Sequence, residues 1–364
     1  MNLLLLLLQN PVKTLQFAYT WTTSSFLVIL QSILLPHYPE YQSLRTRLHR
    51  AYLSSAYLVF PHLTHRLPVG SSVPESRAYP VKDAVHNFNG YLIPGTKRGM
   101  LKDLCEERSS SSHRECVTII YAHGGGYSAG EARMYLPYME RWEKAASDVG
   151  LEVVFLSVEY PLSDGSPHPA QRDAFLGAYR YLLDLGVPAQ QIVFMGDSAG
   201  AGCCVLSGIH CLRLGLPQPA CTVLHSPWLD PSMPAHEGGN ALVATDYVVK
   251  VNAAVPKLWD MWLDGASSTS PDTNPLYNRP SEIYGLNPQL ILVGGGEFAL
   301  QEAKDWKKLC DAAAVDSRLI CEPGQMHIYS LGSKWLAPGV RKRTDEAIFG
   351  WIMEKTSRQS NTTL

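Results

Sequence analysis

The sequence predicts an α/β fold in which a mostly parallel central sheet is covered by helices on both faces. Apolar, strand-like runs recur along the chain, and helical segments separate most of them, which is typical of parallel sheets with crossover helices. The chain has 364 residues, 46% of them hydrophobic, enough for one large domain with additions or for two domains. The strand-like runs begin at Val117, Glu152, Ile192, Cys221, Gln289 and Ser317, and the helical segments include residues 134–149, 170–185 and 302–314.

The N-terminal segment is unusually apolar. Residues 15–35 carry no formal charge, although several Thr, Ser and Gln residues dilute the run, and their length is close to the roughly 20 residues that a transmembrane helix needs. Three interpretations remain open: a membrane anchor, an interfacial helix, or an apolar helix packed against a cap. If the segment spans a membrane, the positive charges after it favour a cytoplasmic main domain; otherwise we expect a cytoplasmic protein.

The rest of the chain divides into two parts by composition. Residues 1–80 read as the apolar segment followed by helix and loop that we expect to contribute to a cap, and residues 81–364 read as the main domain, with its first strand within residues 85–94. The net charge of −2 and the lack of a long basic run give nucleic-acid binding no support. No Cys/His spacing resembles a zinc site, and we expect neither a metal nor a cofactor.

A possible nucleophile lies in residues 196–200, which read Gly-Asp-Ser-Ala-Gly. The pentapeptide stands between the run that begins at Ile192 and a helix-compatible segment, residues 201–216. A G-x-S-x-G sequence between strand and helix is typical of a nucleophile elbow, whose tight turn projects the serine hydroxyl above the sheet edge. We therefore expect Ser198 to be the nucleophile and the N–H of Ala199 to be an oxyanion donor. The alternative is a chance match on a loop.

A second motif, His-Gly-Gly-Gly at residues 123–126, follows the strand-like run 117–121. Consecutive glycines let the backbone approach a substrate closely and turn its N–H groups inward. Acyl transfer needs such donors where the oxyanion forms, so we expect Gly124, Gly125 or Gly126 to complete an oxyanion hole. We expect His123 to shape this loop rather than transfer protons. A plain glycine turn is the alternative.

The alternation of strands and helices stops between about residues 231 and 286. Helical pieces lie there among Pro and Gly, and no central strand is evident; the family that the motifs of this chain resemble implies a helical cap over the serine in this stretch. An apolar cap would bind part of a substrate and exclude water. The candidate lining residues are Met233, Tyr247, Val249, Trp259 and Trp262, each of which could equally be a core residue.

These motifs resemble the hormone-sensitive-lipase branch of the α/β-hydrolases, also called the GDXG lipolytic enzymes. The resemblance runs from about Val117 to about Leu331 and implies an α/β-hydrolase fold with a helical cap and hydrolysis of carboxylic esters. Besides the two glycine motifs, it includes residues 160–162 (Tyr-Pro-Leu), 167–170 (Pro-His-Pro-Ala), 173–174 (Asp-Ala), 226–230 (Ser-Pro-Trp-Leu-Asp) and 324–327 (Gly-Gln-Met-His). By this resemblance Tyr160 and Asp173 are expected to fix backbone around the oxyanion loop.

The fold also implies the order serine, acid, histidine along the chain. His327 is the only histidine after His236, so it is the candidate base. The acid is expected on the loop after the strand 289–293, where many family members carry Asp-Pro-Leu and this chain has Glu-Phe-Ala at residues 297–299. Glu297 can replace an aspartate, because either carboxylate can accept the imidazole N–H. Glu302 and Asp305 remain as alternatives.

The predicted function is therefore a serine carboxylester hydrolase with the triad Ser198, Glu297 and His327. Its substrate is expected to be a hydrophobic small-molecule ester, such as a lipid, a sterol ester or a secondary metabolite, with membrane association possible through the N-terminal segment. A transacylase or cyclase that uses the same acyl-enzyme is an alternative. A non-catalytic receptor is a further alternative, since the gibberellin receptors resemble this family but lack its histidine.

Overall fold

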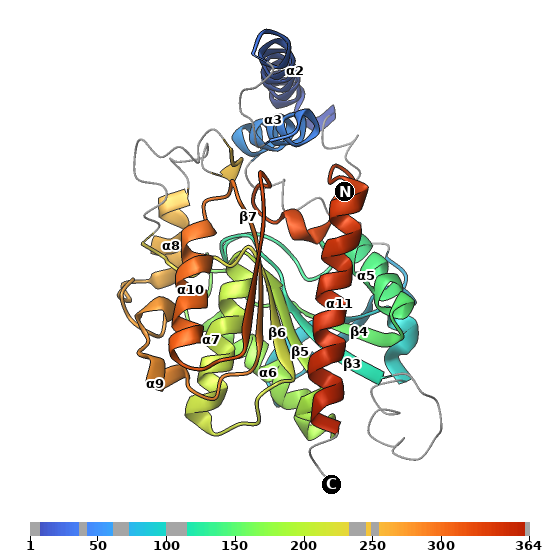
Figure 1. Cartoon of the computed structure of the whole chain (residues 1–364), viewed down its shortest axis with the longest axis vertical. Helices are drawn as coiled ribbons and strands as arrows, with labels where there is room; N and C mark the ends of the chain where they lie inside the picture. Colours follow the sequence, from blue (N-terminus) through green and yellow to red (C-terminus); the bar gives the residue numbers. More distant parts are fainter. Residues whose placement is uncertain are drawn as a thin grey trace.

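An eight-stranded sheet forms the centre of the computed structural model, which describes residues 8–35, 42–60, 73–99, 115–232, 245–248 and 255–360 (Figure 1). The strand order is β1-β2-β4-β3-β5-β6-β7-β8. The β1–β2 and β2–β4 pairs are antiparallel and the other five pairs are parallel, so the mostly parallel sheet is confirmed. The strands are β1 (Tyr79–Asp83), β2 (Phe88–Ile93), β3 (Glu115–Ala122), β4 (Leu151–Val158), β5 (Ile192–Asp197), β6 (Cys221–His225), β7 (Gln289–Gly294) and β8 (Ser317–Glu322).

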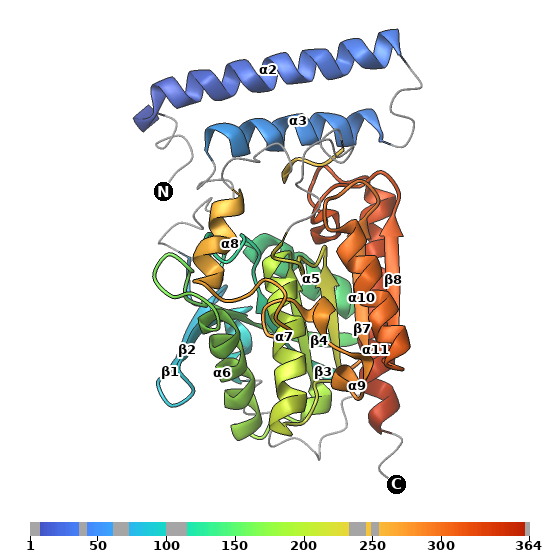
Figure 2. The same cartoon turned by 90° about the vertical axis from the view of Figure 1, so that its left-hand side faces the viewer.

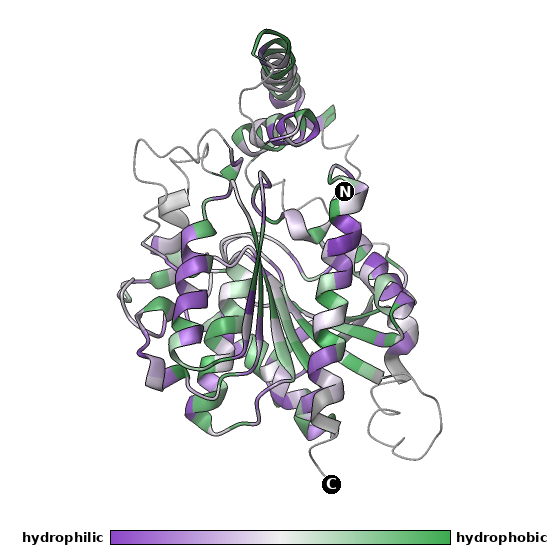
Figure 3. Ribbon diagram, in the orientation of Figure 1, coloured by the Kyte–Doolittle hydropathy of each residue, from purple (hydrophilic) through white to green (hydrophobic). Residues whose placement is uncertain are grey.

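Helices cover both faces of the sheet, because successive side chains of the central strands point to opposite faces. In β3, Ile119 belongs to one buried cluster and Ile120 to the other. The first cluster includes side chains of α5 (Leu136–Asp148) and α11 (Pro338–Ser360), and the second includes side chains of α6 (Ala170–Asp184), α7 (Ala199–Leu214) and α10 (Leu300–Ala312). The central strands are hydrophobic, and α10 and α11 carry hydrophilic residues (Figure 3).

The sheet begins earlier than the sequence indicated. β1 starts at Tyr79, and its burial alternates between half-buried and exposed residues, as expected for an edge strand. The predicted first strand, residues 85–94, did not include β1, which pairs with β2 as an antiparallel hairpin. β2 (Phe88–Ile93) lies within the predicted range.

The N-terminal residues form two antiparallel helices outside the sheet layers. α2 (Pro11–Leu34) and α3 (Leu44–Val59) pack through rings of Phe17, Trp21 and Tyr52. α3 lies across the edge of the sheet at which the parallel strands end, opposite the C-terminus of the chain, and α2 lies outside α3 (Figure 2). α2 is the one helix among the described residues that is long and apolar enough to cross a membrane by length and composition.

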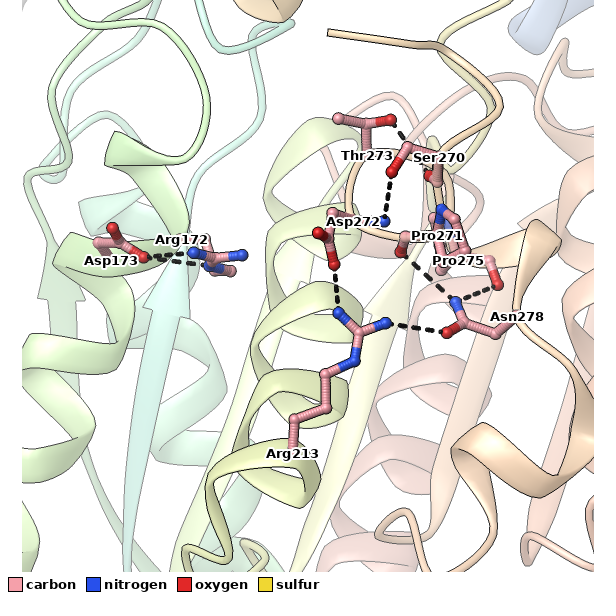
Figure 4. Close-up of polar contacts among 9 residues, drawn as sticks. All are labelled: Arg172, Asp173, Arg213, Ser270, Pro271, Asp272, Thr273, Pro275 and Asn278. Carbon is pink, nitrogen blue, oxygen red and sulfur yellow. Dashed lines mark hydrogen bonds and ion pairs between the residues drawn. The ribbon is translucent and has the colours of Figure 1, made fainter.

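The described part of the predicted cap contains α8 (Val255–Leu263), the 3-10 turn η6 (Pro275–Tyr277) and the short α9 (Pro280–Ile283). Residues 233–244 and 249–254 of the predicted range, including Met233 and Val249, lie outside the described residues. Arg213 of α7 contacts the second half of this segment: it forms an ion pair with Asp272 and donates a 3.2 Å hydrogen bond to the Asn278 side chain (Figure 4). The segment is therefore tied to the helix that follows the serine.

Candidate active site

Ser198 stands on a sharp turn between β5 and α7. Its backbone has φ 52° and ψ −121°, a conformation that is strained for a residue with a side chain. Its N–H donates to His225 O at 2.9 Å, and its carbonyl accepts hydrogen bonds from Gly202 and Trp228. These bonds hold the turn in place while the N-terminus of α7 begins at the next residue, as in a nucleophile elbow.

The glycines of this turn are required by backbone contacts. A Cβ on Gly196 would lie 2.6 Å from Gly200 C, and a Cβ on Gly200 would lie 2.1 Å from Ala122 O. The atoms closest to a Cβ on Gly200 belong to the backbone of β3 and of the oxyanion loop, so no flexible side chain could move aside to make room for it. The pentapeptide therefore allows α7 to pack directly against the end of β3.

We expect the substitution Gly200→Ala to lower the free energy of unfolding by about 3 kcal/mol or more, because overpacking against backbone outweighs the gain in helix propensity. Gly350→Ala in α11 is the matched control, since its Cβ would meet nothing within 4 Å and the helix should gain about 1 kcal/mol. Urea unfolding followed by circular dichroism measures both. Equal stability of the two variants would contradict the packing described above.

His327 and Glu297 lie beside the serine. His327 Nε2 is 2.9 Å from Ser198 Oγ, and His327 Nδ1 is 3.5 Å from Glu297 Oε1. The second distance is longer than a normal hydrogen bond. Nδ1 and Oε1 are both buried, and neither has another hydrogen-bond partner among the described residues. Such contacts are often long before a substrate binds, so the three side chains have the geometry of a Ser-His-acid triad.

The environment of His327 favours its protonated form. Burial lowers its pKa, but the close contact with Glu297 and the negative charges of Glu297 and Asp246 act in the opposite direction, and the net result is a pKa above the usual 6.5. A base with a raised pKa accepts a proton from a serine hydroxyl more readily.

Glu297 is held in place by two hydrogen bonds to its other oxygen. Ser226 Oγ donates to Glu297 Oε2 at 2.7 Å, and the backbone N–H of Gly294 donates to the same oxygen at 2.9 Å. The alternative acids point elsewhere. Glu302 accepts from the backbone N–H groups of Leu229 and Asp230, and the Asp305 carboxylate pairs with Lys308.

Asp246, which sequence reasoning missed, joins the acid loop to the histidine loop. Its carboxylate accepts from the backbone N–H of Phe298 at 2.9 Å and of His327 at 3.3 Å. Burial raises its pKa to about 6, against the opposing effect of His327. Asp246 lies in a stretch without periodicity or motif, so the sequence carried no signal for it. Ser226 was also missed as a partner of Glu297, although it begins the Ser-Pro-Trp-Leu-Asp motif.

The glycine loop at residues 123–126 lies against the elbow, but its three glycines are not equivalent. The N–H of Gly124 donates to Asp197 Oδ1 at 2.9 Å, so it is already occupied. Gly125 and Gly126 have φ values of +116° and +59°, which glycine adopts without strain. Within the described part of the chain, the N–H groups of Gly125, Gly126 and Ala199 donate to no protein acceptor. These three remain as candidate oxyanion donors.

Asp197 and Tyr160 fix the oxyanion loop. Asp197 accepts from Tyr121 and Tyr135 hydroxyls, each at 2.8 Å, as well as from Gly124, and burial raises its pKa to about 6. Tyr160 donates to His123 O and stacks on the His123 ring, with centroids 4.1 Å apart. The prediction for Asp173 was wrong: its carboxylate is exposed and pairs with Arg172, because the first turn of α6 faces solvent at that position (Figure 4).

A cavity of about 210 Å³ reaches His327. α3 forms one wall with Thr46, His49, Leu53 and Tyr57, which share one face of the helix, and the opposite side includes Tyr135, Tyr138, Tyr247 and residues of the loop after β8. Of the candidate cap residues, Tyr247 lines this cavity, whereas Trp259 and Trp262 belong to the buried core. No group of three or more His, Cys, Asp or Glu side chains within the described ranges is placed to hold a metal ion.

Several known proteins are similar to this chain. Residues 119–331 match the family model of the alpha/beta hydrolase fold. An acetyl-hydrolase of Streptomyces hygroscopicus is 31% identical over 214 residues, which are 58% of this chain and 68% of that protein. A solved esterase of the bacterial hormone-sensitive lipase family is 25% identical with a TM-score of 0.63, over 85% of this chain and 90% of that one.

A solved esterase/lipase from an uncultured bacterium aligns with a TM-score of 0.66 and 21% identity, over 86% of this chain and 99% of that chain. Its likeness supports the fold, while the family match covers more than half of the sequence. The chain therefore belongs to the α/β-hydrolase family, as a member that is similar to the hormone-sensitive lipases.

Proposed function

We propose that this protein hydrolyses carboxylic esters through an acyl-enzyme on Ser198. The observation that carries the proposal is the 2.9 Å approach of His327 Nε2 to a serine hydroxyl held on a strained turn. The similar acetyl-hydrolase and the solved esterases support the same class of reaction.

The residues then take the following roles. Ser198 Oγ attacks the ester carbonyl carbon while its proton passes to His327 Nε2, and Glu297 stabilises the imidazolium through Nδ1. The N–H groups of Gly125, Gly126 and Ala199 stabilise the oxyanion, helped by the N-terminus of α7. His327 returns the proton to the leaving alcohol oxygen as the C–O bond breaks. Water then attacks the acyl-enzyme by the same route and releases the acid.

The cavity indicates the kind of ester. Its volume of about 210 Å³ and its Tyr, Leu and Met lining favour a small or medium apolar group next to His327. A hydrophobic ester is therefore the proposed substrate class, and association with a membrane through the N-terminal helices is part of the same proposal, since α2 is largely exposed and apolar.

A panel of p-nitrophenyl esters of increasing acyl length tests this function. We expect release of p-nitrophenol from the short and medium chains, and we expect a fluorophosphonate probe to label Ser198, as identified by mass spectrometry of the labelled peptide. Pre-treatment with the probe should abolish hydrolysis. Absence of both label and hydrolysis in the folded protein would leave a ligand-binding role and end the hydrolase proposal.

A further inference from the structure

The outer side of α2 is apolar where a soluble protein would be polar. Five side chains form the outer stripe of α2, at helical spacings of three, four and seven residues: Val12, Leu15, Tyr19, Phe26 and Ile33. They are between 61% and 77% exposed. Their spacing places them on one face of the helix. The exposed Thr22 lies within the stripe, between Tyr19 and Phe26. An exposed apolar face of this length marks a contact with another surface.

Polar contacts of α2 lie instead on its inner side, toward α3. The buried Arg47 of α3 donates to Ser32 Oγ and to Gln31 Oε1, each at 3.0 Å. Val28, one turn before Ser32, is the buried residue of α2. The inner side of α2 thus combines these polar contacts with the apolar packing of Phe17, Trp21 and Val28, whereas the outer stripe has no contact with the described residues that would explain its apolar character.

The charge of the two helices indicates which surface covers the outer stripe. Residues 8–35 and 42–60 contain Lys13, Arg45, Arg47 and Arg50 and no Asp or Glu. Lys13 is exposed near the start of α2, whereas the Arg45 guanidinium donates to Lys334 O and Trp335 O of the main domain. An apolar face that carries an exposed lysine, on a helix without acidic residues, is complementary to an anionic lipid surface.

We propose that α2 lies flat in the interface of an anionic bilayer, with its outer stripe among the acyl chains and α3 between the bilayer and the active-site cavity. The geometry supports a flat helix over a spanning one, because α3 runs beside much of α2 and a buried arginine of α3 is bonded to it (Figure 2).

The same layering connects the bilayer to the cavity. One face of α3 lines the cavity near His327 and another packs on α2 through Tyr52, so a single helix, about 10 Å thick, separates the lipid-facing layer from the reaction site. If the proposed ester hydrolysis holds, on which this step rests, the substrate is an ester that resides in the membrane.

Two neighbouring substitutions distinguish a flat helix from a spanning one. Phe26 belongs to the outer stripe, whereas Ser25 is half-buried on the side of Ser32, two turns before it. Phe26→Lys is expected to reduce flotation of the full chain with phosphatidylcholine–phosphatidylserine vesicles about tenfold or more, while Ser25→Lys stays within about threefold of the unsubstituted protein. In a spanning helix both lysines would lie near the bilayer centre, and both variants would fail to bind.

Further outcomes decide the remaining points. Val85→Lys, at an exposed apolar position on the β1–β2 turn, is the control for surface charge and should float normally. Equal flotation of Phe26→Lys and the unsubstituted protein, or no flotation of the unsubstituted protein, overturns the proposal. The proposal is also overturned if the unsubstituted protein sediments as a dimer and does not bind vesicles, and Phe26→Lys dissociates that dimer. A second copy of the chain would then cover the stripe.

Activity separates this proposal from the proposed function. Hydrolysis of water-soluble p-nitrophenyl acetate should be the same in both lysine variants, which shows that they fold, whereas hydrolysis of a long-chain ester embedded in the vesicles should fall about tenfold in Phe26→Lys alone. Normal flotation without any ester hydrolysis would contradict the enzyme assignment and leave membrane docking supported. A rate on the embedded ester that is independent of flotation would overturn the membrane-resident substrate.

Discussion

Replacement of Ser198 by alanine is expected to lower kcat for a p-nitrophenyl ester by at least about 10³. The hydroxyl is the one group in the proposed mechanism that forms a covalent bond to the acyl carbon, and the oxyanion donors and binding contacts that remain supply only residual catalysis. The variant should fold normally, since Ser198 makes its turn contacts through backbone N–H and C=O groups. Initial rates and a thermal melting curve measure the two effects.

Ser207→Ala is the matched control for this loss. Ser207 is buried in the same helix, more than two turns beyond Ser198, and it plays no part in the proposed chemistry. We expect its kcat to stay within a few-fold of the unsubstituted protein. Equal rates for Ser198→Ala and Ser207→Ala, with no esterase contaminant in either preparation, would refute Ser198 as the nucleophile.

The second large effect is expected at Glu297, where substitution by glutamine should lower kcat by about 10⁴. Loss of the orienting carboxylate costs about this much in a Ser-His-Asp triad, since the imidazole is left in the wrong tautomer. The pH profile should change as well. In the unsubstituted protein His327 must be neutral to act as a base, and its pKa is raised, so kcat/KM should fall with decreasing pH through a midpoint above 6.5. Removing Glu297 should move that midpoint to lower pH.

Glu302→Gln provides the comparison for the acid. Burial raises the pKa of Glu302 to about 8, so its carboxyl is mostly protonated at pH 7 and cannot supply the negative charge that an imidazolium needs. Glutamine resembles the neutral carboxyl in shape, and kcat should remain within about tenfold. The assignment of Glu297 fails if Glu302→Gln shows the greater loss or if Glu297→Gln leaves both the rate and the acid limb unchanged.

The local motifs of the sequence predicted much of the fold and the serine turn. Gly196 and Gly200 stand where any Cβ would meet backbone, and such requirements are visible in a sequence because only glycine satisfies them. The strand beginnings at Ile192, Cys221 and Gln289 were predicted correctly, since buried parallel strands are continuous apolar runs. The edge strand β1 was missed because none of its five residues is fully buried and two of them are exposed.

The sequence could not assign the contacts between distant loops. Gly124 was expected among the oxyanion donors, but its N–H is occupied by Asp197, which is 73 positions away in the chain. Asp246 reaches the histidine loop across 81 positions. Neither contact leaves a local pattern, because each depends on how two loops meet above the sheet edge.

By itself the sequence determined the mostly parallel sheet, the turn that carries Ser198 and the candidate residues His327 and Glu297, because strand periodicity, glycine spacing and residue type are local properties of the chain. Only the tertiary structure decided which carboxylate lies beside the imidazole, which glycine N–H groups are left without a protein acceptor, and which side of α2 faces outward. These depend on distances between segments far apart in the chain, and those distances are set by packing of the whole domain.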